Sequence, residues 1–168
     1  MKVISFYGII LTFLIANTFT VSAQDSYTIT NFDELIKQNS NSNRNQQSYS
    51  EEEIEILKSL IFDLNPLIII NGTESKKLGE GNPKLVIVKS DNLSQLASNI
   101  EEMQNVILLN IKHSLSTTPG LLDLSAIKIS SLKYVLIECD FECNTRNIEK
   151  ILKNTSSVKV LYRTTLEQ

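Results

Sequence analysis

Few side chains of this chain could take part in acid–base or nucleophilic chemistry. His113 is the single histidine, and a Ser-His-Asp or Cys-His arrangement would have to use it. It lies at the end of a predicted strand, beside Lys112 and Ser114, where a histidine is expected on the solvated surface. The sequence contains no G-x-S-x-G, Walker or G-x-G-x-x-G motif,. We therefore expect a protein that is not an enzyme and uses no cofactor.

The two cysteines, Cys139 and Cys143, stand four positions apart. A redox-active pair is usually spaced C-x-x-C, so either a local disulfide or two packed thiols are expected here. One histidine and two cysteines do not make a tetrahedral zinc site without carboxylates,. The acidic residues at 51–53 and 101–102 are interpreted as a helix start and a solvated helix face,. No metal site is predicted, while paired carboxylates of a glycoside hydrolase stay an open alternative.

Residues 1–23 have the layout of a secretory signal peptide. Lys2 precedes an apolar run that ends at Ile15, and small residues stand before Ala23,. The apolar run is short for a membrane span, and Asn17 and Thr18 interrupt it,. We predict cleavage after Ala23, no stable membrane span in the mature chain, and a protein that is secreted or periplasmic.

Charge and length restrict the class of the mature protein. Cleavage removes one lysine and no acid, which leaves 15 basic against 19 acidic residues and a net charge of −4. This acidic balance argues against a nucleic-acid partner and against a polybasic membrane patch. The mature chain, residues 24–168, is long enough for one domain with its own core.

The mature chain divides into two parts. Residues 24–49 form an N-terminal segment with an Asn-, Gln- and Ser-rich linker that cannot bury apolar surface,. Residues 50–168 form the folded domain, which opens with a capping box from Ser50 to Glu53,. Strands and helices then alternate, which favours a parallel sheet. We expect strands at 67–71, 85–89, 106–112, 133–138 and 158–162, and helices at 50–64, 93–103 and 145–153.

Apolar positions recur at a constant interval in the middle of the domain. Leu109 follows Val86, and Ile111 follows Val88, each at an interval of 23. The apolar positions between 86 and 114 resemble the leucine-rich-repeat pattern at every apolar slot,. Three residues depart from the pattern: Asp91 and Ser114 stand where the family prefers Asn, and Ala97 stands where many members have Pro.

The resemblance recurs in weaker form over residues 67–163. Val135 follows Leu109 at an interval of 26, and the last strand is aligned with the one before it at an interval of 23. The resemblance implies an α/β fold: a short leucine-rich-repeat-like solenoid of about four to five parallel strands with helical returns. The alternative is a compact open parallel α/β sheet.

One face of the predicted sheet is unusually apolar for a surface, because six of its eleven outward residues are large and apolar or aromatic,. Either the segment 26–64 covers this face or a partner does, and we favour the segment. Members of the leucine-rich-repeat family typically bind partners on their concave face. The resemblance therefore implies a binding surface of Leu108, Asn110, Lys112, Tyr134, Leu136, Glu138 and Lys159.

The function expected from these observations is binding of another protein, outside the cell or in the periplasm, without catalysis. A narrower alternative is an immunity protein that neutralises a toxin in the envelope, suggested by size, export and acidic charge. A third, from another class, is an extracellular hydrolase, which would require clustered carboxylates or His113 in a pocket.

Overall fold

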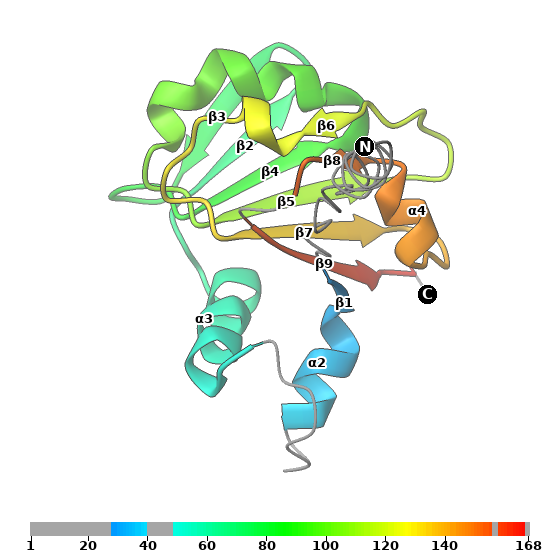
Figure 1. The fold of residues 1–168 in the computed structure, drawn as a ribbon. Coiled ribbons are helices and arrows are strands. Elements are labelled where there is room, and N and C mark those ends of the chain that lie inside the picture. The colour runs from blue at the N-terminus through cyan, green and yellow to red at the C-terminus, as the bar shows by residue number, and fades with distance from the viewer. Residues whose placement is uncertain (1–27, 40–48, 156–157, 167–168) are drawn as a thin grey trace, which may run out of the picture.

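The structure is a computed structural model that describes residues 28–39, 49–155 and 158–166. The predicted signal peptide and most of the predicted linker lie outside these residues. The described chain forms an α/β fold with a seven-stranded, mostly parallel sheet in the order β1-β9-β7-β5-β4-β2-β3 (Figure 1). Its strands are β1 (Ile29–Asn31), β2 (Leu67–Asn71), β3 (Glu74–Leu78), β4 (Leu85–Lys89), β5 (Leu108–His113), β7 (Tyr134–Cys139) and β9 (Lys159–Thr164).

The strands β2, β4, β5, β7 and β9 lie side by side in chain order, and all are parallel. The segments that return the chain between β4 and β9 lie on the same face of the sheet, the upper one in Figure 1. They are the 3-10 helices η1 (Ser90–Met103) and η2 (Leu124–Ala126), the helix α4 (Thr145–Glu149), and the paired short strands β6 (Leu122–Asp123) and β8 (Leu152–Lys153).

The strand register confirms two of the predicted intervals, including the interval of 26 between Leu109 and Val135, and corrects a third. Val86 pairs with Leu109, at the expected interval of 23. Val135, however, pairs with Val160, at an interval of 25 rather than 23. A shift of two residues leaves every side chain on the same face of the sheet, so the apolar pattern could not distinguish the two registers.

Three predicted segments differ from the structure. The residues between the expected strands 67–71 and 85–89, for which no element is expected, contain β3, which forms an antiparallel hairpin with β2. All five β3 residues are exposed, so the strand has no apolar alternation that would reveal it. The expected helix at 145–153 ends at Glu149 because the chain then enters β8, which pairs with β6. The expected helix at 93–103 is the 3-10 helix η1, which begins at Ser90.

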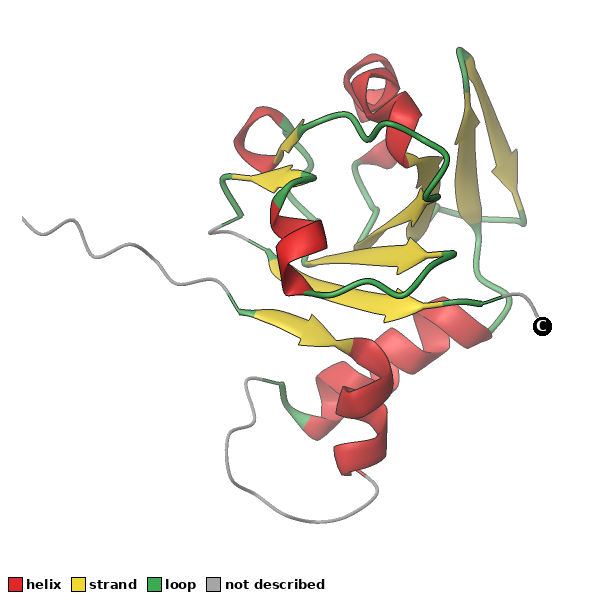
Figure 2. Ribbon diagram, turned by 90° about the vertical axis from the view of Figure 1, so that its right-hand side faces the viewer, coloured by secondary structure: helices red, strands yellow, loops and turns green. Residues whose placement is uncertain are grey.

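Two helices cover the opposite face of the sheet. They are α2 (Phe32–Asn39) and α3 (Glu51–Phe62), which lie below the sheet in Figures 1 and 2. The predicted capping box is present, because Ser50 accepts a hydrogen bond from the Glu53 backbone and the Glu53 side chain accepts one from Ser50. The segment preceding α2 adds β1 to the sheet edge, where Ile29 pairs with Val160.

Each face of the sheet therefore has its own core. The return segments bury a largely aliphatic cluster that includes Val86, Leu109 and Ile137. The helices α2 and α3 bury a second cluster that includes Phe32, Leu57 and Leu136. The described parts of the segment 26–64 thus cover the apolar face, which confirms the favoured expectation. Within the described ranges, no helix is long and apolar enough to cross a bilayer.

Candidate functional site

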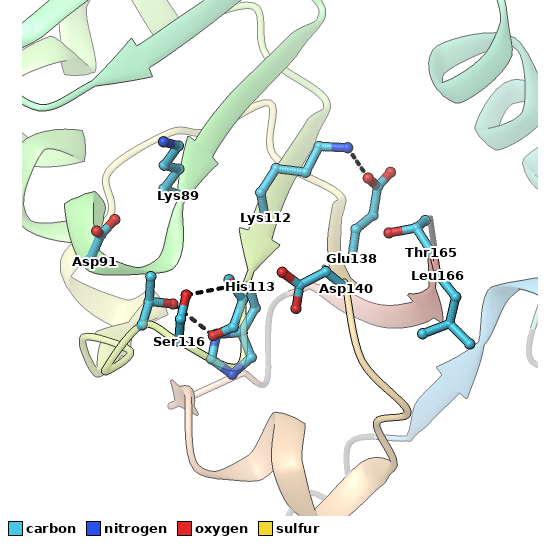
Figure 3. Close-up of a pocket in the computed structure, with 11 residues that line it drawn as sticks. Lys89, Asp91, Lys112, His113, Ser116, Glu138, Asp140, Thr165 and Leu166 are labelled. Atoms are coloured by element: carbon cyan, nitrogen blue, oxygen red, sulfur yellow. Dashed lines mark hydrogen bonds and ion pairs between the residues drawn. The ribbon is translucent and has the colours of Figure 1, made fainter. Parts of the chain in front are cut away.

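A cavity of about 510 Å³ opens where the parallel strands β4, β5, β7 and β9 end. The carboxyl ends of parallel strands are the usual place for ligands in open α/β sheets. Side chains from these ends point into the cavity, as Figure 3 shows. The lining residues are Lys89, Asp91, Lys112, His113, Ser114, Ser116, Thr117, Glu138, Asp140, Thr165 and Leu166.

The first set of charged residues at the cavity, which we name the basic row, crosses four neighbouring strands in register. It consists of Lys89, Lys112, Glu138 and Arg163. Glu138 is 2% exposed, and its carboxylate accepts hydrogen bonds from Arg163 at 2.6 Å, from Asn110 at 3.0 Å and from Lys112. These partners offset the cost of burying the carboxylate. Lys89, Lys112 and Glu138 line the cavity, whereas Arg163 supports Glu138 from outside its lining.

A second set, the acidic row, lies two residues further along the chain, just beyond the ends of the four strands. It consists of Asp91, Ser114, Asp140 and Thr165, all of which line the cavity. The carboxylate of Asp140 accepts a hydrogen bond from the backbone of Leu115 at 3.0 Å. Hydrogen bonds from the Ser114 side chain and the Leu115 backbone lower the pKa of Asp140 below its usual value. The row therefore presents negative charge to the same cavity.

His113 lies in the cavity wall and is mostly buried, so the expectation of a solvated surface histidine is wrong. Its Nδ1 atom lies 3.0 Å from Oγ of Ser90, and its ring packs edge-on against Phe141 at 5.3 Å between centroids. Burial lowers the pKa of His113, which favours the neutral imidazole. Ser90 precedes His113 by the same interval of 23, so the repeat alignment contained the signal for this pair.

The hydroxyl of Ser90 is poorly placed for nucleophilic attack. Ser90 is fully buried, and its Oγ also lies 3.2 Å from Oγ1 of Thr117, so this contact holds the cavity wall together. The residues with hydroxyl groups that line the cavity are Ser114, Ser116, Thr117 and Thr165. Among the described residues, no group of three or more His, Cys, Asp or Glu side chains could hold a metal ion. The arrangement offers charges and hydrogen bonds to a bound group.

The residues predicted to form a concave binding surface divide into two groups. Leu108, Tyr134 and Leu136 are at most 2% exposed, because α2 and α3 pack over them. An accessible binding face made of these three residues is therefore not found. The sequence suggested their apolar character but not which segment would cover them.

The polar members of the predicted surface lie at the rim of that covered face. Lys112 and Glu138 line the cavity, and Asn110 donates a hydrogen bond to Glu138. Lys159 forms an ion pair with Glu53 of α3 at 2.7 Å, which ties the helix to the sheet. The predicted surface thus included two of the residues that line the cavity, Lys112 and Glu138. It did not include Lys89, Asp91, Asp140 and Leu166, because the periodicity within one segment does not indicate which residues of different segments lie close in space.

The two cysteines are free thiols in this structure. Cys139 is buried and Cys143 is partly buried, with its Sγ atom 3.9 Å from Oγ1 of Thr164. Burial, together with a hydrogen bond to Cys143, raises the pKa of the Cys139 thiol.

Two exposed leucines belong to the segments that line the cavity. Leu115, between the cavity residues Ser114 and Ser116, is 76% exposed. Leu166, which itself lines the cavity, is 61% exposed. Large apolar side chains beside a polar cavity are typical of contact sites for a partner.

Comparison with protein-family models finds no matching family, and searches of curated proteins and of solved structures find no similar chain.

Proposed function

We propose that this protein is an exported, non-catalytic binding protein, and that it contacts a protein partner at the cavity where the parallel strands end. The observation on which this depends is the open cavity that exposed Leu166 lines, with exposed Leu115 between the lining residues Ser114 and Ser116. Apolar side chains supply the anchoring energy of many interfaces, and surrounding polar groups supply specificity. Both kinds of group are present at this one site.

The position of the proposed site follows from what covers the rest of the sheet. The face that would be concave in a leucine-rich-repeat protein lies under α2 and α3, and the other face lies under the return segments. The carboxyl edge of the strands remains accessible, with Lys89 and Asp91 exposed. A partner can reach this edge without displacing any helix.

We also infer that the strands β2, β4, β5, β7 and β9 are units of a short leucine-rich-repeat-like solenoid. Their order along the sheet supports this inference, because each pairs in parallel with the next strand of the set. The placement of η1, η2 and α4 on one face supports it as well. In this interpretation α2 and α3 are an added cover, and partner binding has moved from the concave face to the edge.

The proposed function can be tested by affinity capture from the native envelope and culture fluid. The bait would be the tagged mature protein, compared with Leu115→Asp and Leu166→Asp variants. Leu64→Asp is the matched control, because Leu64 is fully exposed but does not line the cavity. All three variants are expected to fold, since exposed substitutions change stability little.

We expect one partner that is lost with both cavity variants and retained with the control. A partner retained by all variants would show that binding occurs elsewhere and would contradict the proposed site. If the partner were a toxin, the protein would be an immunity protein. Equal recovery of background proteins with every bait would contradict the proposed function.

A hydrolase is the second candidate, because His113 lies in the cavity wall near Asp140. Burial of Ser90 and the Ser90–His113 contact argue against a reactive hydroxyl at this place. Chromogenic esters and glycosides would be incubated with the protein and with a His113→Gln variant. We expect no turnover above buffer, whereas turnover that His113→Gln abolishes would favour the hydrolase.

A further inference from the structure

We propose that two copies of this chain join through β3, so that their two sheets become one continuous sheet. β3 is the last strand in the sheet order and, among the described strands, pairs only with β2 (Figure 1). All five of its residues are exposed. An edge strand leaves a row of backbone N–H and C=O groups that another strand can pair with. This surface is distinct from the cavity, because no residue of β3 lines the cavity.

The backbone groups that β3 presents at the sheet edge are those of Ser75 and Lys77. Asn71 and Glu74 pair across a two-residue turn, and the residues that flank such a turn exchange backbone hydrogen bonds. Successive residues of a strand direct their N–H groups to alternate sides. The N–H of Glu74 and of every second residue after it therefore points to β2, whereas those of Ser75 and Lys77 point away from the sheet.

The charges of β3 select one register for this pairing. Two identical edge strands related by a two-fold axis run antiparallel, and the residue on the axis lies opposite its own copy. With Ser75 on the axis, Glu74 of each copy lies opposite Lys76 of the other. The two Ser75 residues exchange backbone hydrogen bonds, so the Glu74–Lys76 pairs occupy the positions where opposite side chains are closest. The dimer thus has two cross-strand pairs of opposite charge, which are stabilising.

Every other centre of symmetry within β3 is less favourable. An axis at Glu74, Lys76 or Lys77 places like charges directly opposite each other, which is destabilising. An axis at Leu78 would need the strand to continue past Leu78, where it ends, and the next residue, Gly79, has a φ of +81°, outside the β region. Lysines on an edge strand usually oppose pairing with other chains. Here Glu74 supplies the opposite charge at the spacing that a two-fold axis requires.

The first measurement is the state of association of the mature protein. Sedimentation equilibrium would be recorded from about 10 µM to about 1 mM, a range in which weak complexes dissociate measurably. We expect a reversible equilibrium between monomer and dimer, with no larger species, because the pairing uses up the β3 edge of both copies. A protein that stays monomeric over the whole range would overturn the proposal.

Charge reversal tests the register. Glu74→Lys and Lys76→Glu each place like charges opposite each other at two positions, and each should weaken dimerisation about 30-fold, as expected for two lost cross-strand pairs. Glu74→Lys together with Lys76→Glu in one chain should restore the parent affinity. A mixture of the two single variants should form a mixed dimer of the same affinity. Lys77→Glu, on the other face of the strand, is the matched control and should have little effect.

A proline substitution tests the backbone pairing. Ser75→Pro removes an N–H that points away from β2, and proline is tolerated at such positions of edge strands. The variant should melt like the parent in circular dichroism but stay monomeric at about 1 mM. A dimer that persists in Ser75→Pro would overturn the proposal. So would two single charge variants that fail to form a mixed dimer, a result that does not depend on how Ser75→Pro folds.

Discussion

The two faces of the sheet are buried by segments of different origin. The upper face is covered by η1, η2 and α4, each of which connects strands that it covers. The lower face is covered by α2 and α3, which come from the N-terminal part of the chain and pack on distant strands such as β7 and β9. One face is therefore closed by local connections and the other by long-range contacts.

The residues buried on the two faces of the sheet also differ in polarity. The upper core is largely aliphatic, whereas the lower one includes Tyr49 and Tyr134 and is tied by the Glu53–Lys159 ion pair. An ion pair of this kind fixes the orientation of α3 on the sheet, because no short connection to the strands beneath it does so. The comparison teaches that an apolar strand face is a binding surface only if the rest of the chain leaves it open.

The largest effect is expected from placing a charge in either core. Leu136 and Ile137 are neighbours on opposite faces of β7, and both are fully buried. Aspartate at either position should abolish cooperative unfolding, because burial of an unpaired carboxylate costs more than about 4 kcal/mol. Circular dichroism during heating measures this. A Leu136→Asp variant that melted like the parent would show that α2 and α3 do not cover the lower face.

Removal of β1 and α2 should open the lower face alone. A mature chain that begins at Tyr49 loses the buried residues Phe32 and Leu35, each worth about 1.5–3 kcal/mol. We expect the urea midpoint to fall and a hydrophobic dye to bind the exposed face. Lys37→Ala, on the exposed side of α2, is the control. Unchanged dye binding would mean that α3 alone closes this face.

The buried charge at the rim should have a smaller effect. Glu138→Gln keeps the shape of the side chain but removes the charge that Lys112 and Arg163 neutralise. We expect a loss of about 1–3 kcal/mol in the free energy of unfolding, measured in urea. Glu55→Gln breaks the exposed pair with Lys58 and should cost at most about 0.5 kcal/mol. Equal effects of the two variants would show that Glu138 is solvated.

The smallest expected effects are changes in how stability depends on pH. They differ between the core under α2 and α3 and the cavity at the strand ends. Burial, followed by the charge of Glu53, raises the pKa of Tyr134 from 10.0 to about 12. The stability from the neutral tyrosine is present below pH 10 and is lost as pH rises toward 12,. Tyr134→Phe should flatten this alkaline loss in pH-dependent urea unfolding. A loss of the same steepness in Tyr134→Phe would place its cause elsewhere.

His113 should show the opposite dependence at the cavity. Burial lowers its pKa from 6.5, so the unfolded chain binds the proton more readily than the folded one. Stability is complete above pH 6.5 and falls on acidification below it,. His113→Asn should reduce the loss just below this pH, and an unchanged profile would contradict the buried neutral histidine.

The local sequence pattern was sufficient to predict many of the strands and helices. The apolar strands and the capping box at Ser50 could be predicted because they depend on neighbouring residues,. The register of β4 with β5 followed from the repeat interval. Strand β3 could not be predicted, since it is exposed on both faces. The pairing of β1 with β9 could not either, because no periodicity states which distant segment a strand will meet.

The candidate site was predicted only in part for the same reason. Lys112 and Glu138 were identified because they alternate with apolar residues along β5 and β7. Asp91 and Asp140 follow strand ends, where no period applies, and Leu166 follows the last strand. The cavity depends on the relative stagger of four strand ends, which includes the two-residue shift at β9 that the apolar pattern did not resolve.

The pairing of β1 with β9 joins the first described strand to the last one. A ribosome or an export channel delivers a chain from its N-terminus, so β1 emerges long before its only sheet neighbour. Residues 29–31 and the helix that follows them must wait until residue 162 has appeared. Leu161, which this helix region helps to bury, is among the last apolar residues to be delivered. The seven-stranded sheet therefore gains its edge strand β1 only after the residues of β9 have been synthesised, although β1 is made first.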